Sequence, residues 1–279
     1  MPRPIHRLIL AALALAAPLA SPPAASADPI RVVIDPGHGG QSMGALGAYG
    51  VYEKYVTLSI ALRLGRLLEA EPGVAVFYTR NDDVFVDLKD RPTLANALDA
   101  DLFVSVHCNA SPATEAHGIE TFYLGTGGAD AEADEVALRE SGGLPATGTP
   151  DDDPALGAIL TDLKRSANQT GSAVLASTLQ RRLLAAFPET VSRDVRQARF
   201  AVLRRAAMPA VVVEVGFLTH ATEGQHLLLA PYQDRLATAL KDAVMTYVRS
   251  GTARLAPDLP RADRKRPGKT GRRPIARGE

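Results

Sequence analysis

The chain has 279 residues, 46% of them hydrophobic, and its formal net charge at pH 7 is zero. This length and composition suffice for one well-filled core or two small ones. The single cysteine excludes an intramolecular disulfide, so stability must come from packing. After the first 27 residues, no segment is long and apolar enough to predict a transmembrane helix.

The first 27 residues have the pattern of a secretory signal peptide. Residues 1–7 carry two arginines and no acid, residues 8–20 form an apolar run, and Ala25-Ser26-Ala27 is a small-x-small sequence. The apolar run is too short to span a bilayer, although an uncleaved anchor is the alternative. We therefore expect cleavage before Asp28 and export, to the periplasm or cell envelope.

The charge is distributed unevenly along the rest of the chain. Residues 252–279 contain nine Lys or Arg, three Asp or Glu and no aromatic residue, whereas residues 28–251 contain 20 basic and 28 acidic residues. This pattern predicts a globular domain at 28–251 and a basic disordered tail. The tail is either a solvated end or a means of loose adhesion to an anionic polymer or lipid. Because residues 28–251 carry a net negative charge, we expect no nucleic-acid partner.

The first half of the chain alternates between strand and helix patterns. Short β-branched runs predict strands, and the spacing of Val56, Ile60, Leu64 and Leu68 predicts a helix. In chain order we expect a strand at 30–35, a Gly-rich loop at 41–50, a helix at 53–71, a strand at 74–79, a helix at 87–98 and a strand at 102–107.

The second half continues this alternation, with one exception. We expect strands at 119–124, 201–203 and 210–215, and helices at 174–187 and 231–249. The segment 125–170 is long and rich in acids and glycines, and we interpret it as an insertion. The whole pattern predicts a single α/β domain with a twisted, mostly parallel sheet flanked by helices on both faces.

Two histidines and a glutamate follow or end predicted strands. His38 lies in the turn V-V-I-D-P-G-H-G-G, His107 ends the strand at 102–107, and Glu214 lies in a buried β-branched run. In open α/β sheets, ligands bind at the carboxyl ends of the strands. A carboxylate in a buried strand is costly unless it is paired or close to a metal ion.

A fourth residue completes a plausible set of metal ligands. Glu53 opens the first long helix directly after the Gly-rich loop, where an acid is also favoured by the helix dipole alone. Two imidazoles, one carboxylate and an open position make the usual catalytic zinc set, and a second carboxylate can act as general base. Cys108 follows His107 in its strand, so its side chain should point to the opposite face.

Six sequence stretches, in the same order as in one known family, extend from about residue 30 to 250. They are V-V-I-D-P-G-H-G-G, Y-E-K-Y-V-T-L-S-I-A-L-R-L, Y-T-R-N-D-D, A-D-L-F-V-S-V-H-C-N-A, H-G-I-E-T-F-Y-L and P-A-V-V-V-E-V-G-F-L-T-H. With them the chain resembles the zinc-dependent N-acetylmuramoyl-L-alanine amidases of bacterial cell-wall turnover and daughter-cell separation.

The resemblance implies the roles of four residues. His38, Glu53 and His107 correspond to the ligands of one Zn²⁺ ion, and Glu214 corresponds to the catalytic glutamate. The implied substrate is peptidoglycan, cleaved at the amide between N-acetylmuramic acid and L-alanine. Two alternatives stay open: a zinc hydrolase of another peptidoglycan bond, such as a peptidase or deacetylase, and a non-catalytic wall-binding protein on the same fold.

The insertion at 125–170 contains two predicted helices, at 131–140 and 154–164. Members of the resembling family that act in cell separation carry an inserted helix that blocks the zinc cleft until a partner protein displaces it. We therefore expect the first helix to lie over the metal, with Glu135 or Glu140 contacting zinc. The leucine face from Leu156 to Leu163 would bind an activator, a catalytically inactive relative of zinc endopeptidases, or would simply pack on the domain.

Overall fold

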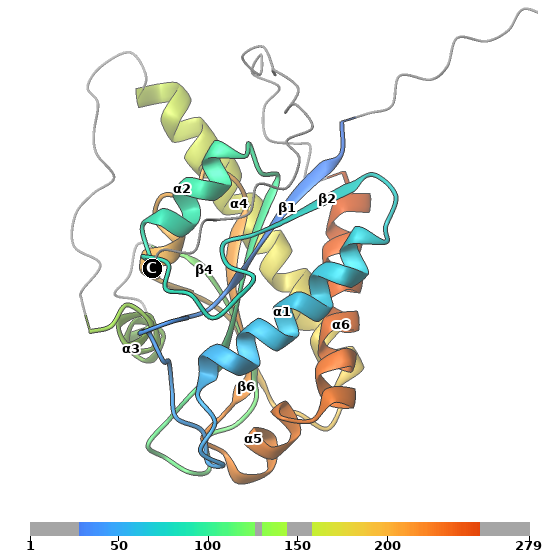
Figure 1. Ribbon diagram of the computed structural model, residues 1–279. Helices are drawn as coiled ribbons and strands as arrows, with labels where there is room; N and C mark the ends of the chain where they lie inside the picture. Colours follow the sequence, from blue (N-terminus) through green and yellow to red (C-terminus); the bar gives the residue numbers. More distant parts are fainter. Residues whose placement is uncertain (1–27, 126–129, 144–157, 252–279) are drawn as a thin grey trace, which may run out of the picture.

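A six-stranded sheet forms the centre of the molecule (Figure 1). The computed structural model describes residues 28–125, 130–143 and 158–251, without the side chains of 158–165. The strand order is β2-β1-β3-β6-β4-β5. The strands are β1 (Ile30–Pro36), β2 (Val74–Tyr78), β3 (Leu102–Asn109), β4 (Ile119–Leu124), β5 (Ser192–Ala198) and β6 (Ala210–Phe217).

Most of the strand pairings are parallel, as the sequence predicts. The four strands β2, β1, β3 and β6 run parallel to one another, and β4 is parallel to β5. The pair β4–β6 is antiparallel, so the sheet is mixed. The carboxyl ends of β1, β3 and β6 therefore meet at one edge of the sheet.

Helices cover both faces of the sheet, which confirms the predicted α/β architecture (Figure 1). One face packs against three long helices and the other against two short ones. The first group is α1 (Glu53–Glu69), α4 (Ala158–Ala186) and α6 (Ala230–Arg249), and the second is α2 (Asp90–Ala97) and α3 (Ala131–Glu140). A short helix, α5 (Ala221–Leu227), follows β6 and contacts it.

The pleat of the strands separates the two cores. In β6, Val211, Val213 and Val215 face the three long helices, whereas Val212 faces the two short ones. Glu214 has the same parity as Val212, so its side chain lies on the side of the short helices. In β3, Cys108 packs in the aliphatic core with the long helices, as expected. The preceding residue, His107, points to the other face of the sheet.

One predicted strand is wrong, and one observed strand was not predicted. Residues Ala201–Leu203 form a 3₁₀ helix instead of a strand, and the strand in this region is β5, at Ser192–Ala198. β5 is an edge strand with a mostly polar, partly exposed sequence, so the period-2 apolar pattern of a buried strand is missing.

The helices expected at 154–164 and 174–187 belong to one continuous helix, α4, which begins at Ala158. The interior Gly171 does not interrupt it. A Cβ atom at Gly171 would lie 2.8 Å from Pro209 Cγ and 3.0 Å from Tyr247 Oη, so this glycine permits close packing of the helix. The expected insertion, 125–170, therefore ends inside a helix of the domain.

Several sequence predictions lie outside the described residues. They concern the signal peptide at 1–27, the basic tail at 252–279 and the leucine face from Leu156 to Leu163, whose side chains the structure does not describe. Within the described residues, no helix combines the length and the hydropathy that crossing a membrane requires.

Candidate metal centre

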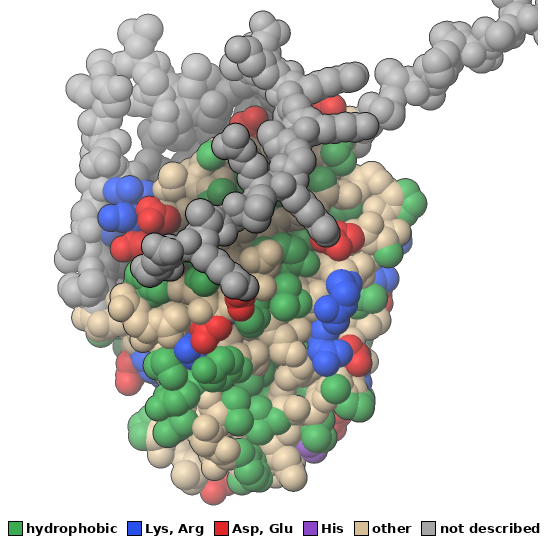
Figure 2. All heavy atoms as spheres, in the orientation of Figure 1, with side chains coloured by type: hydrophobic (Ala, Val, Ile, Leu, Met, Phe, Trp, Pro, Cys, Tyr) green, Lys and Arg blue, Asp and Glu red, His purple; other side chains and the backbone are tan. Residues whose placement is uncertain are grey.

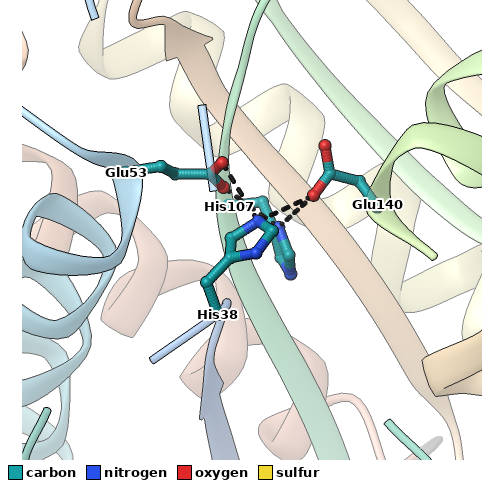
Figure 3. A group of neighbouring side chains, drawn as sticks. All are labelled: His38, Glu53, His107 and Glu140. Carbon is teal, nitrogen blue, oxygen red and sulfur yellow. Dashed lines mark hydrogen bonds and ion pairs between the residues drawn. The ribbon is translucent and has the colours of Figure 1, made fainter. Parts of the chain in front are cut away.

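Four side chains from four different parts of the chain converge on the carboxyl-terminal edge of the sheet (Figure 3). They are His38, Glu53, His107 and Glu140, and each offers a ligand atom within 4.8 Å of the others. The sequence predicts the first three as metal ligands, and the structure brings all three together. The fourth comes from α3, inside the expected insertion.

His38 reaches the cluster from a strained turn after β1. Its φ is 60°, a left-handed conformation that is uncommon outside glycine, and Gly39 and Gly40 also have positive φ. This turn directs the imidazole back over the edge of the sheet. His38 Nδ1 lies 3.0 Å from Ser42 Oγ, so an Nδ1–H that donates to Ser42 leaves the Nε2 lone pair facing the cluster.

Glu53 is fully buried at the first turn of α1. Its Oε2 accepts a hydrogen bond from Ala45 N at 3.0 Å, and its Oε1 accepts one from Cys108 N at 3.1 Å. Because both donors are backbone amides of neighbouring elements, the carboxylate is fixed in place before any ligand binds. The helix dipole further favours a negative charge at this position.

His107 projects from the end of β3, where it is paired in register with Glu214 of β6. The turn after β1 approaches its ring closely: a Cβ atom on Gly37 would lie 2.5 Å from two ring atoms of His107. A glycine at this position therefore makes room for the imidazole. Cys108 packs on the opposite face and is not among the four clustered residues.

Glu140 closes the cluster from the last turn of α3. Its Oε2 lies 2.9 Å from His38 Nε2 and 3.0 Å from His107 Nδ1. Glu135, the other acid that the sequence suggests for this contact, is exposed on α3 and does not belong to the cluster. The buried residues Ala133, Val136 and Ala137 share one face of α3 with Glu140, at the spacing i, i+3, i+4 and i+7.

These short contacts shift the pKa values of the clustered residues. Burial lowers the pKa of His38, but the charge of Glu53 and the hydrogen bond with Glu140 outweigh burial and raise this pKa to about 9. Burial raises the pKa of Glu53, yet the nearby charge of His38 and the hydrogen bond with His107 hold it well below the usual range. The site therefore concentrates negative charge where a cation would bind.

The donor set fits a divalent metal ion such as zinc. Ligand atoms about 2.0–2.1 Å from a tetrahedral ion lie about 3.3 Å apart. The nitrogen–oxygen separations among His38 Nε2, His107 Nδ1 and the carboxylates of Glu53 and Glu140 are 2.9–3.1 Å. Two imidazoles and two carboxylates on this scale match the number, type and spacing of the ligands that zinc takes.

Glu214 lies beside the cluster with an unpartnered carboxyl group. It is fully buried, and neither of its oxygens has a hydrogen-bond partner among the described residues. Burial and the nearby charge of Glu140 raise its pKa well above the ordinary value, while His107 acts in the opposite direction. A buried carboxyl group without partners is costly for folding, so a functional reason for it is expected.

Two residues that the sequence interpretation did not single out connect α3 to the site. Arg139 Nη2 donates a hydrogen bond to Asn109 Oδ1 at 2.6 Å, and Asn109 Nδ2 donates to the buried carboxylate of Glu120 on β4. Asn109 follows His107 by two residues and so shares its face of β3. The alternation of side chains along β3 could therefore have indicated Asn109 from the sequence, whereas no local pattern indicates the contact with Arg139.

The fold and this cluster define a single-domain α/β protein with a buried, carboxylate-rich site suited to a metal ion at the carboxyl ends of its parallel strands. Residues 32–246 match the N-acetylmuramoyl-L-alanine amidase family. The chain belongs to this family of hydrolases, which confirms the resemblance that the sequence motifs carry.

Individual relatives agree with this assignment. The chain is 34% identical over 219 residues to the N-acetylmuramoyl-L-alanine amidase AmiA of Escherichia coli (strain K12), covering 77% of this chain and 75% of the relative. It is 32% identical over 229 residues to the amidase AmiC of Escherichia coli O6:H1, covering 80% of this chain. The match spans only 54% of that AmiC, about half of its length.

Solved structures with a similar fold include N-acetylmuramoyl-L-alanine amidases. The crystal structure of an N-acetylmuramoyl-L-alanine amidase from Clostridium difficile 630 matches 80% of this chain and 99% of its own, with a TM-score of 0.63 and 31% identity. The catalytic domain of the amidase CwlV from Bacillus (Paenibacillus) polymyxa matches 79% of this chain, with a TM-score of 0.60 and 29% identity.

Proposed function

We propose that this protein is a zinc-dependent amidase that hydrolyses the bond between N-acetylmuramic acid and L-alanine in peptidoglycan. The observation that carries the proposal is the buried convergence of His38, Glu53 and His107 beside the unpartnered Glu214. Membership of the amidase family supports the choice of this bond over those cut by peptidases or deacetylases. His38, Glu53 and His107 would hold one Zn²⁺ ion.

The reaction requires a proton to move from water to the leaving nitrogen. When bound, zinc supplies a Lewis acid that polarises the scissile carbonyl and makes water a better nucleophile. Glu214 accepts the proton of the attacking water and then donates it to the nitrogen of L-alanine as the C–N bond breaks. Water gives its oxygen to the lactyl carbonyl carbon and both of its protons to the leaving nitrogen, so the products are the lactyl carboxylate and the ammonium group of the peptide, and atoms and charge balance.

The position of Glu140 supports regulation of the same site. A catalytic zinc site keeps one position open, whereas a site with four protein ligands is closed. Glu140 supplies a fourth donor, so α3 in its present position prevents the substrate carbonyl from reaching the centre. We infer that α3 is autoinhibitory. If the closed state is favoured by about 2.7 kcal/mol, roughly 1% of the molecules are open and basal activity is low but measurable.

Release of α3 then needs a partner. The proposed activator is a catalytically inactive relative of zinc endopeptidases that binds around Leu156–Leu163, during cell separation. Only Ala133, Val136 and Ala137 are buried from α3, so the helix is held by little apolar surface compared with α1, which buries Val56, Ile60, Leu64 and Leu68. The signal-peptide pattern of residues 1–27 supports export to the periplasm or cell envelope.

Digestion of purified sacculi tests the activity. The protein should release intact stem peptides and peptide-free glycan, as identified by mass spectrometry of the products. Treatment with a chelator should abolish release, and added Zn²⁺ should restore it. Cleavage inside the peptide or loss of acetyl groups would contradict the proposed bond, and full activity of a protein without bound metal would contradict the proposed chemistry.

Two substitutions on one helix test autoinhibition. Glu140→Gln removes the carboxylate that contacts both histidines, whereas Glu135→Gln changes an exposed acid of the same helix. Hydrogen bonds to charged groups contribute about 1.5–3 kcal/mol, so Glu140→Gln should raise basal activity about tenfold or more. Deletion of residues 131–140 should act in the same direction. If both changes leave a folded, zinc-loaded enzyme no faster than the parent, autoinhibition by α3 is wrong.

A further inference from the structure

Two arginines on the edge strand β5 form the most extensive charge cluster outside the metal centre among the described residues. Arg196 makes a two-pronged contact with Asp130 and a hydrogen bond of 3.1 Å with Glu132 Oε2. Arg193 also pairs with Glu132. Both guanidinium groups lie close to the buried carboxylate of Glu120, with nitrogen–oxygen distances of 3.5 Å from Arg193 and 3.3 Å from Arg196.

These arginines lie on the same side of the sheet as the catalytic centre. Glu214 of β6 is paired in register with Glu120 of β4, and β4 is paired with β5. Neighbouring strands are about 4.8 Å apart, so β5 lies about 10 Å from Glu214 across the sheet. Arg196 is paired in register with Phe122, which belongs to the core under α3. The side chain of Arg196 therefore lies on the face of the sheet that α3 covers.

The acidic partners of the arginines come largely from α3. Asp130 is the N-cap of α3, and Glu132 lies in its first turn. Once α3 leaves, Glu120 is the one acidic partner that Arg193 and Arg196 keep among the described residues, so an uncompensated positive charge remains. Arg193 Nε is buried and already has no hydrogen-bond partner among the described residues. Two fixed guanidinium groups with one shared acid are well suited to bind another carboxylate.

We propose that Arg193 and Arg196 form a substrate subsite that binds a carboxylate of the peptide attached to the scissile amide, and that Asp130 and Glu132 occupy this subsite while α3 is closed. The proposal rests on the proposed amidase function and on release of α3. Helix α3 then imitates an acidic substrate at two points: Glu140 at the metal centre, and Asp130 with Glu132 at the arginines.

The distance between the two points fits a peptide. An extended chain covers about 3.3–3.6 Å per residue, so about three residues span the distance of about 10 Å from Glu214 to β5. A carboxylate on the second or third residue after the cleaved amide therefore reaches the arginines. The subsite would select peptides that carry such a carboxylate over peptides in which it is an amide.

The test uses a full-length variant without the α3 carboxylates that contact the metal centre and the two arginines: Asp130→Asn, Glu132→Gln and Glu140→Gln. Steady-state kinetics of this released variant are measured with an N-acetylmuramoyl tripeptide and with the same compound whose carboxyl groups are amides. Arg196→Gln and Arg193→Gln are then added separately. Arg63→Gln is the matched control, because Arg63 pairs with Asp234 on the opposite face of the sheet.

We expect the released variant to have about a tenfold lower KM for the acidic substrate than for the amidated one. Arg196→Gln should raise KM for the acidic substrate about tenfold and leave kcat within about twofold. Neither arginine substitution should change KM for the amidated substrate, and Arg63→Gln should change neither. An arginine that only clamps α3 would have no effect on KM once the clamp is released.

The possible failures are distinguishable. Equal KM values for the two substrates in the released variant would overturn the subsite and leave the amidase function intact. An equal rise of KM for both substrates after Arg196→Gln would also overturn it. If the released variant cleaves neither substrate, the proposed function fails and the subsite with it. If Arg196→Gln does not fold, the comparison of KM for the two substrates in the released variant still tests the subsite. A rise of KM with salt for the acidic substrate alone supports the subsite.

Discussion

The two faces of the sheet differ in what they bury. The face under α1, α4 and α6 is an aliphatic core that includes Val104, Leu64 and Leu240. The face under α2 and α3 also has an apolar centre, but at its carboxyl-terminal edge it buries Asp35, His107, Glu120 and Glu214. The first face therefore provides stability mainly by apolar packing, whereas the second places charged groups where they are costly and chemically useful.

The difference between the faces arises within single strands. Val213 and Glu214 are neighbours in β6, and His107 and Cys108 are neighbours in β3, yet each pair divides between the two faces. The pleat thus lets one strand contribute a stable core and a reactive site. The long helices hold the strands, so the proposed release of α3 would leave the main core intact.

The largest expected effect concerns the buried ion pair beside the site. Arg91 Nη1 donates to Asp35 Oδ1 at 2.8 Å, and both side chains are almost fully buried. Asp35→Asn leaves a buried guanidinium without its charge partner and should cost about 3–5 kcal/mol of unfolding free energy at pH 7. Asp234→Asn breaks an exposed pair with Arg63 on the other face and should cost less than about 1 kcal/mol.

The same variant has a pH signature, measured by urea unfolding between pH 3 and 7. Burial raises the pKa of Asp35, but the charge of Arg91 and hydrogen bonds from Ser105 and Thr79 hold it below its ordinary value of 3.8. Because the pKa is lowered in the folded state, its contribution is present above pH 3.8 and is lost as the pH falls through the folded pKa. The difference between parent and variant should therefore shrink in acid. A constant difference would mean that the charge of Asp35 does not stabilise the fold.

On the aliphatic face, truncation should affect stability alone. Leu64 of α1 is fully buried, and Leu64→Ala should lower the unfolding free energy by about 3 kcal/mol. Leu67→Ala, at a partly exposed position of the same helix, should cost less than about 1 kcal/mol. Metal content and kcat of the folded fraction should match the parent in both variants. A loss of metal in Leu64→Ala would show that the two faces are not independent.

On the polar face, the opposite outcome is expected for Glu214→Gln. The change keeps the shape and removes the proton acceptor, so turnover should fall about 10²-fold or more while zinc content and unfolding free energy are retained. Because the parent carboxyl group is buried without partners, stability should not decrease. If metal content falls in step with activity, Glu214 is a ligand and the proposed role is wrong.

The smallest effect is expected at Cys108, which follows a proposed ligand in sequence but faces the aliphatic core. Burial raises the pKa of the Cys108 thiol well above its ordinary value, so the thiol behaves as a small apolar group. Cys108→Ala should cost about 1 kcal/mol and leave the zinc content unchanged. His107→Ala is the paired experiment and should abolish zinc binding. Loss of zinc in Cys108→Ala would place the thiol in the site.

The order of the elements and three of the clustered residues were predictable from local patterns. Periodicity predicts β1, α1 and β6 closely, because their burial is strong and regular. It also predicts α3 at Ala131–Glu140. His38 and His107 follow from the rule that strand ends meet at one edge of a parallel sheet, whereas Glu53 was predicted from its position after the Gly-rich loop and from the family resemblance. Their exact roles stay proposals that the experiments above decide.

For Glu140, the apolar periodicity of α3 contained more information than the sequence interpretation used. Both Glu135 and Glu140 lie on α3, and the sequence interpretation left the choice between them open. The apolar positions Ala133, Val136 and Ala137 define the face that packs on the sheet, and Glu140 continues that face whereas Glu135 does not. The periodicity of the helix thus contained the answer, but only for a helix already known to dock.

What the sequence determined by itself is the class of the fold and the residue types of the site, because apolar periodicity and strand-end polarity are local properties. Only the tertiary structure decided the antiparallel insertion of β4 between β6 and β5, and the encounter of Arg193 and Arg196 with Asp130, Glu132 and Glu120. These contacts join residues more than 60 positions apart along the chain. The geometry of these contacts depends on the orientation in which α3 packs on the sheet. Many small packing contacts together determine that orientation.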